Sequence, residues 1–163
     1  MTLSRDLLRL KLDESLAASP RTLTRRDVRL PGIRRKALAV IGVRRSGKTS
    51  FLSQCRTDRL SADQAPESQL LLSLEDERLV GLTVADLGWL VEEHTRVLAG
   101  VAGAKSRTLY LDEVQTVPGW EGLVRRLMDG GGVEVFVSGS SARLLSREVA
   151  PKLAIASPSS PAT

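Results

Sequence analysis

The stretch that decides the fold is GVRRSGKT, residues 42–49, which comes directly after the apolar run KALAVI, residues 36–41. It fits the pattern G-x-x-x-x-G-K-[ST] at every fixed position, and a helical pattern follows from about Lys48 to Arg56. Glycines let the backbone wrap around a phosphate with its N–H groups pointing inward. The helix that follows turns the positive end of its dipole to the same anion. The stretch therefore predicts a phosphate-binding (Walker A) loop rather than a plain glycine-rich turn.

Two side chains of this loop carry the expected chemistry. Lys48 can reach the β- and γ-phosphate oxygens of a nucleotide, and the Thr49 hydroxyl can ligate Mg²⁺. Arg44 and Arg45 occupy variable positions, where they either add positive potential near the phosphates or are simply exposed, and we do not expect them to be catalytic. The predicted nucleotide-binding residues are Gly42, Val43, Arg44, Arg45, Ser46, Gly47, Lys48, Thr49 and Ser50.

The second half of such a site is a carboxylate at the end of another parallel strand, and the segment LYLDE supplies it. Asp112 suits a magnesium ion and its bound water (Walker B), and Glu113 can orient and polarise the attacking water as the catalytic group. A further apolar strand ends in SGSS. Ser138 there would lie beside Asp112 and contact the γ-phosphate or the water. The alternative is that Ser140 or Ser141 only caps the next helix.

Apolar runs alternate with amphipathic segments along the chain, which predicts an α/β fold with a mostly parallel sheet between two helical layers. The expected strands are residues 36–41, 69–75, 107–113 and 133–140, and the expected helices are about 3–19, 48–56, 83–101, 119–131 and 141–149. Residues 22–30 alternate apolar and polar, as a short strand or extended arm would, and residues 57–68 are expected to be a polar loop.

The last residues differ in character. The sequence PKLAIASPSSPAT, from residue 151, is rich in Ser, Pro and Ala and predicts a disordered tail. Its PKLAIA begins with proline and is short, so we expect no fifth strand there; the last core strand would be missing and the 36–41 strand would lie at an exposed edge. The expected organisation is an N-terminal helix at 1–22, a nucleotide-binding core at 23–148 and a tail at 149–163.

Composition excludes some classes of function. The charged and apolar fractions, 26% and 42%, are those of a soluble globular protein, and no apolar run reaches membrane-spanning length. One cysteine, Cys55, allows no internal disulfide and fits a cytoplasmic protein; we expect it to be a buried bystander. The net charge of +5 comes largely from arginine doublets and leaves nucleic-acid contact open, but aromatics at 3% are too few for a base-stacking platform.

The sequence favours adenine over guanine nucleotides. GTPases need an Asn-Lys-x-Asp element to read guanine, and none is present. Asp129 begins a D-x-x-G match, but it precedes a strand instead of following one, and a helix-ending turn explains it better. His94 is the single histidine and is expected on a polar helix face, so a histidine-based triad or metal cluster has no support.

The ordered run GVRRSGKTSFL, LLLSLEDERL, YLDEVQTVPGWEGLVRRL and VFVSGSSARLLSRE resembles prokaryotic AAA-family P-loop ATPases of the kind called AAA domain type 14. The resemblance covers about Leu23 to Glu148. It implies that the phosphate-loop strand is central, with the Asp112 strand one place removed, and that Ser138 or Ser140 senses the γ-phosphate. Family members continue with a Thr-x-Leu-x-Gly-Arg segment and a C-terminal domain, whereas this sequence has REVAPKLAIASPSSPAT and resembles a truncated product.

These observations together predict a domain that binds ATP with Mg²⁺ and hydrolyses it slowly, as an AAA-type ATPase without an identifiable transition-state arginine. The alternative is a nucleotide-responsive switch or binding module with negligible hydrolysis, associated with DNA or another partner. A phosphotransferase acting on a small molecule is the weakest option, because no lid or acceptor motif is visible. The expected partners are ATP and either a second copy of the chain or a C-terminal effector domain, with no membrane.

Overall fold

The computed structural model describes residues 3–20, 25–27, 37–104, 106–140 and 152–154 of the chain. The helices are α1 (Arg5–Ala17), α2 (Lys48–Ser61), α3 (Val84–Ala99) and α4 (Trp120–Gly130). The strands are β1 (Leu38–Ile41), β2 (Gln69–Ser73), β3 (Arg107–Asp112), β4 (Val133–Gly139) and β5 (Lys152–Ala154). Short 3-10 turns lie at η1 (Pro66–Ser68), η2 (Glu77–Leu79) and η3 (Val114–Thr116).

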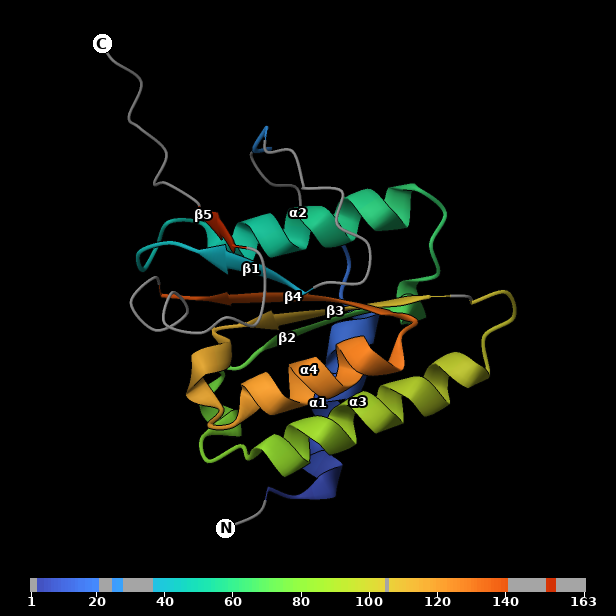
Figure 1. Cartoon of the computed structure of the whole chain (residues 1–163). Helices are drawn as coiled ribbons and strands as arrows, with labels where there is room; N and C mark the ends of the chain where they lie inside the picture. The colour runs from blue at the N-terminus through green and yellow to red at the C-terminus, as the bar shows by residue number, and fades with distance from the viewer. Residues whose placement is uncertain (1–2, 21–24, 28–36, 105, 141–151, 155–163) are drawn as a thin grey trace.

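The strands form one sheet in the order β2-β3-β4-β1-β5, and every neighbouring pair is parallel. Helix α2 covers one face of the sheet, and α3 and α4 cover the other (Figure 1). Strand β1 is buried along its whole length, as its continuous apolar run predicts for a strand covered on both faces. The predicted α/β three-layer fold is confirmed, as is the placing of β1 inside the sheet with β4 between it and β3.

The prediction that the fifth strand is missing is wrong. Lys152–Ala154 form β5, which pairs in parallel with β1 so that Val40 lies opposite Leu153. Proline at position 151 does not prevent this, because a proline just before an edge strand removes no hydrogen bond from the ladder. Strand β1 is therefore not an edge strand. The rest of the predicted tail lies outside the described residues.

The core has one cluster on each face of the sheet. Beneath α2, Phe51, Leu52 and Cys55 pack against Leu38, Val40, Tyr110 and Phe136. The rings of Tyr110 and Phe136 stack with their centroids 5.1 Å apart. Burial raises the pKa of the Cys55 thiol to about 11, so it stays protonated, as expected of a bystander. The larger cluster lies under α3 and α4 and includes Leu8 and Leu12 of α1.

Helix α1 covers the outer edge of the sheet at β2. Its N-terminus is capped by the Ser4 hydroxyl, which accepts from the N–H of Asp6 at 3.2 Å. Ser15 near its other end reaches the edge strand, where its Oγ donates to the Leu71 carbonyl at 2.6 Å and accepts from the Leu71 N–H at 3.1 Å. One hydroxyl thus satisfies both backbone groups of an edge residue, and α1 belongs to the same core as the sheet.

Two sequence predictions are wrong, and a third concerns residues that lie outside the described part of the chain. Helix α2 runs to Ser61 instead of ending near Arg56, so much of the predicted polar loop is helical. His94 is fully buried and not on a polar face, because η1 packs over it. The helix predicted at 141–149 lies outside the described residues. Among the described helices, none is both long and apolar enough to cross a membrane.

Candidate nucleotide site

The carboxyl ends of three neighbouring strands bring the predicted site residues together. The loop of residues 42–47 follows β1, Asp112 ends β3, and Ser138 is the penultimate residue of β4. Val40 of β1 pairs with Ser138, which sets the register of the loop strand against β4. Parallel strands bring their carboxyl ends to one edge, where ligands of open α/β sheets bind.

The loop wraps around the Lys48 side chain. The Lys48 Nζ donates to the carbonyls of Gly42 at 3.0 Å and Val43 at 3.1 Å, and the side chain is 4% exposed. The N–H of Ser46 donates to the Val43 carbonyl at 3.1 Å, which closes a turn inside the loop. Gly47 caps α2 in the left-handed region, with φ of 89°. The lysine therefore stands inside a closed loop at the positive end of α2.

The Asp112 carboxylate is held from two sides. Thr49 Oγ1 donates to Asp112 Oδ2 at 2.6 Å, and the Ser138 hydroxyl donates to Asp112 Oδ1. Asp112 is buried, at 2% exposure, yet both its oxygens have hydrogen-bond partners. The bond from Thr49 links the first turn of α2 to the end of β3.

Glu113 lies next to this cluster in a left-handed backbone conformation, with φ of 57°. Its Oε1 is 3.5 Å from the Lys48 Nζ, and its Oε2 accepts from Gln115 Nε2 at 2.5 Å. Its N–H donates to Ser138 Oγ at 3.0 Å. The buried serine thus orients both residues of the Asp-Glu pair, and the glutamate is held by one cation and one amide.

The oxygen atoms of Thr49 and Asp112 suit Mg²⁺ as ligands. The ion prefers oxygen ligands, and it is usually bound through one or two carboxylates together with phosphates and waters. Thr49 supplies a hydroxyl and Asp112 a carboxylate, already 2.6 Å apart. Within the described part of the chain there is no group of three or more His, Cys, Asp and Glu residues that could hold a metal without a nucleotide.

The other predicted residues stay at the periphery. Val43, Arg44, Arg45 and Ser50 are exposed, so the arginines of the loop face solvent. Arg45 has φ of 63°, an unusual conformation for a side chain of its size. Of the described hydrogen bonds to Asp112 and Glu113, none comes from Ser140.

Two residues at the site were missed by sequence reasoning. Gln115 binds the Glu113 carboxylate, and Arg26 donates from Nη2 to the Ser46 carbonyl in the loop at 2.6 Å. The only signal for Gln115 was its place two residues after the glutamate. Arg26 belongs to one of the arginine doublets, which were interpreted from the sequence only as a source of net charge.

Comparison with known proteins shows the family to which this fold belongs. The family model described as "AAA domain" matches residues 34–156. This chain belongs to the AAA domain family. The resemblance drawn from the sequence is confirmed, and the AAA domain brings with it nucleotide binding in general and a P-loop fold.

Two relatives of this AAA domain carry no functional description. An uncharacterized protein of Methanocaldococcus jannaschii is 34% identical over 142 residues, which cover 87% of this chain and 30% of the relative. An uncharacterized protein of Haemophilus influenzae is 32% identical over 116 residues, which cover 70% of this chain and 28% of the relative. The chain thus spans less than a third of the length of these curated relatives.

Proposed function

We propose that this AAA domain binds ATP with Mg²⁺ and hydrolyses it to ADP and phosphate. The observation that carries the proposal is the single cluster at the carboxyl edge of the sheet. There a closed glycine loop surrounds Lys48, Thr49 is bonded to Asp112, and Glu113 lies within 3.5 Å of the lysine. These are the parts that phosphoryl transfer to water requires: a phosphate cradle, a magnesium-binding pair and a carboxylate beside them.

Each residue of this chain has a distinct part in the proposed reaction. The loop N–H groups and Lys48 bind the phosphates and offset their negative charge. Thr49 and Asp112 would hold a magnesium ion, which would neutralise charge on the transferred group. Glu113 accepts a hydrogen bond from the attacking water and polarises it. Ser138 keeps Asp112 and Glu113 in place through its two hydrogen bonds.

Nucleotide binding is tested by Lys48→Ala. We expect calorimetry to detect no ATP binding, because the variant loses the cation that the carbonyls of Gly42 and Val43 hold in the loop. Arg44→Ala is the matched control, since Arg44 is an exposed cation of the same loop and alanine keeps the backbone N–H by which this position would bind phosphate, so the affinity should stay nearly unchanged. Equal ATP affinity of wild type and Lys48→Ala would contradict the assignment of residues 42–49 as an ATP-binding loop.

Hydrolysis is tested by Glu113→Gln. General-base catalysis contributes about 10²–10⁴-fold, so we expect phosphate release to fall by at least about 10²-fold while ATP affinity stays within a few-fold of wild type. Glutamine has nearly the size of glutamate and keeps one acceptor oxygen, so it fills the same space while it loses the negative charge that polarises the water. Normal turnover of this variant would take Glu113 out of the water-activating role.

A second candidate is an ATP-responsive switch with negligible hydrolysis. The observation that favours it is the pairing of Glu113 with both Lys48 and Gln115, which occupies both carboxylate oxygens. A phosphate-release assay with and without duplex DNA distinguishes the two, because the net charge of +5 makes DNA a reasonable probe of a partner. Turnover near zero in both arms, with ATP binding intact, supports the switch.

A further inference from the structure

A second cation contacts the phosphate loop from outside the site. Arg26 Nη2 donates to the Ser46 carbonyl at 2.6 Å. The same guanidinium lies directly against Gly47, because a Cβ built on that glycine would be 2.6 Å from Arg26 Nη2 and 3.3 Å from its Cζ. The loop is thus held by Lys48 on the carbonyls of Gly42 and Val43 and by Arg26 on the carbonyl of Ser46.

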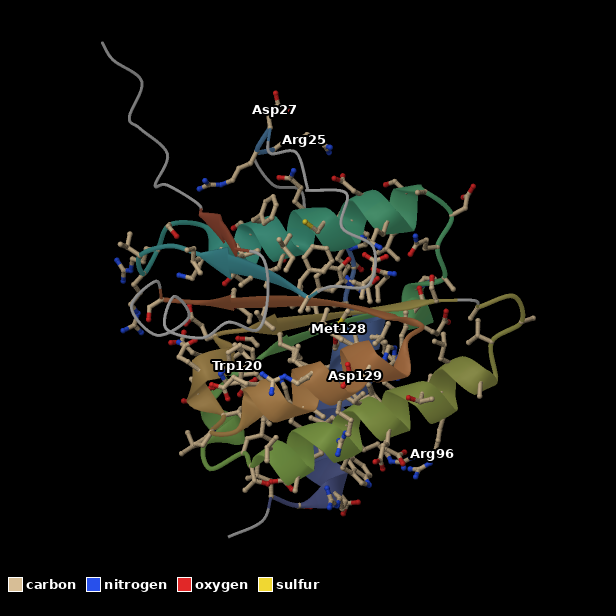
Figure 2. The ribbon with its side chains drawn as sticks, in the orientation of Figure 1. Arg25, Asp27, Arg96, Trp120, Met128 and Asp129 are labelled. Carbon is tan, nitrogen blue, oxygen red and sulfur yellow. The ribbon has the colours of Figure 1, made fainter. Side chains whose placement is uncertain are left out.

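Helix α2 fixes the backbone of Arg26. The Gln54 amide binds both backbone groups of Arg26: its Nε2 donates to the Arg26 carbonyl at 2.8 Å and its Oε1 accepts from the Arg26 N–H at 2.8 Å. The neighbouring Arg25 forms a two-point ion pair with Asp58, with distances of 2.7 and 3.2 Å. Figure 2 shows Arg25 and Asp27 on the outer side of α2, away from the sheet. The guanidinium of Arg26 therefore reaches the loop from a backbone fixed on α2.

The contact has a direct consequence for the loop backbone. In a trans peptide the C=O and the N–H point in opposite directions. When Arg26 holds the Ser46 carbonyl, the N–H of Gly47 in the same peptide is fixed in the opposite direction, away from the guanidinium. The bond is charge-assisted, which makes it roughly twice as strong as a neutral one and suited to hold one peptide orientation.

We propose that Arg26 is a positioning residue of the nucleotide site, acting through the Ser46–Gly47 peptide to aim its N–H at the bound phosphates. This inference rests on the proposed binding of ATP. The loop N–H groups cradle the α- and β-phosphates, which ATP and ADP share. Removing Arg26 therefore weakens both nucleotides equally, whereas loss of a contact to the γ-phosphate would weaken ATP alone.

The test is calorimetry of ATP and ADP, each with Mg²⁺, on wild type, Arg26→Ala, Arg26→Lys and Arg25→Ala. Hydrogen bonds to charged groups contribute enough that we expect Arg26→Ala to lower both affinities by about tenfold. Arg26→Lys and millimolar guanidinium added to Arg26→Ala should each restore part of the loss. Arg25→Ala is the matched control, since it removes an adjacent arginine that binds Asp58 and not the loop, and its affinities should equal those of wild type.

Gln54→Met gives a second measurement that does not depend on Arg26→Ala folding well. Methionine has a similar length but cannot bind the Arg26 backbone, so the variant should show part of the same equal loss for ATP and ADP. The loss from Arg26→Ala should also be smaller in the Gln54→Met background than in wild type, because the two residues act in series.

Several results would overturn the inference. They are unchanged or higher affinity of Arg26→Ala, a loss restricted to ATP, and an equal loss in Arg25→Ala. If wild type itself binds neither nucleotide, the proposed function fails instead. If wild type binds both and Arg26→Ala matches it, only the role of Arg26 is lost.

Discussion

At the scale of single residues, Gly47 is constrained twice. Its φ of 89° lies in the left-handed region, which costs a residue with a Cβ roughly 1–2 kcal/mol. The same Cβ would stand 2.6 Å from Arg26 Nη2, so the guanidinium would have to move away from its position on the Ser46 carbonyl. We expect Gly47→Ala to lower the free energy of unfolding by about 1 kcal/mol or more and to weaken ATP binding, as measured by denaturant unfolding and calorimetry.

Arg45→Gly is the counterpart, because position 45 also has a positive φ of 63° but an exposed side chain. Glycine relieves the backbone strain there, so we expect stability equal to or above that of wild type and unchanged ATP affinity. If Gly47→Ala matched wild type in both stability and ATP affinity, neither the positive φ nor the contact with Arg26 would constrain position 47.

Gln115 should affect turnover and not affinity. Its amide donates to Glu113 Oε2, and among the described hydrogen bonds none joins Gln115 to the loop or to Asp112. When a nucleotide is bound, its phosphates interact with Lys48, and the Gln115 amide still holds the Glu113 carboxylate in place. We expect Gln115→Ala to lower kcat by about tenfold, the value of one hydrogen bond to a charged group, with the ATP dissociation constant unchanged. A rise in kcat would show instead that Gln115 restrains the glutamate.

Local spacing in the sequence was enough to predict which residues lie together at the carboxyl edge of the sheet. Lys48 and Thr49 follow from the loop pattern, and Asp112 and Glu113 follow from their place after an apolar strand. Arg26 could not be predicted in the same way, because its partner Ser46 is 20 residues away and the contact depends on how the chain crosses α2. A doublet of arginines has no pattern that distinguishes the one facing Asp58 from the one facing the loop.

At the scale of elements, α1 shows how an edge strand is protected. Ser15 satisfies both backbone groups of Leu71, which would otherwise lack partners at the sheet edge under the helix. We expect Ser15→Ala to lower the free energy of unfolding by about 1–2 kcal/mol, because it leaves two polar groups unpaired in a half-buried place. Denaturant unfolding is the measurement, with the exposed Ser19→Ala as control. Equal stability of the two variants would mean that water replaces the hydroxyl.

The elements that the sequence predicted well are those with their own hydrophobic pattern. Strands β1 to β4 are apolar runs, and α3 has apolar residues at helical spacing and a Thr83–Asp86 capping box. Strand β5 has only three residues, and its pairing with β1 stabilises it more than its composition does. The extension of α2 to Ser61 was missed because four of the residues 57–61 are polar, although they continue an existing helix at little cost.

At the scale of the whole molecule, β5 decides whether β1 is an interior or an edge strand. A chain that ends at residue 150 lacks β5, and one that ends at residue 156 keeps it. Without β5, the buried apolar β1 presents unpaired N–H and C=O groups on one side, an association hazard. We expect the shorter chain to melt at a lower temperature and to aggregate, as followed by calorimetry and light scattering, and the chain of 156 residues to behave as the full one.

The buried histidine makes stability depend on pH in a defined direction. Burial lowers the pKa of His94 below its ordinary value of 6.5, and the nearby Arg107 adds to this. Its Nε2 lies 2.5 Å from the Glu67 carbonyl and must carry the hydrogen, while Nδ1 is buried without a hydrogen-bond partner in the described structure. The native state therefore keeps the imidazole neutral where the unfolded chain already binds a proton.

The unfolded state thus holds more protons below pH 6.5, so stability falls as the pH drops from there toward the lower native pKa of His94. We expect the free energy of unfolding to decline between pH 7 and 5, with a slope of at most about 1.4 kcal/mol per pH unit for one proton. Hydrogen bonds from Arg78 lower the pKa values of Asp76 and Glu14, so those carboxylates lose their contribution only in more acidic solution. His94→Gln removes the titrating group, and denaturant unfolding of this variant should give a flat profile between pH 7 and 5. A decline as steep as that of wild type would assign the pH dependence to another group.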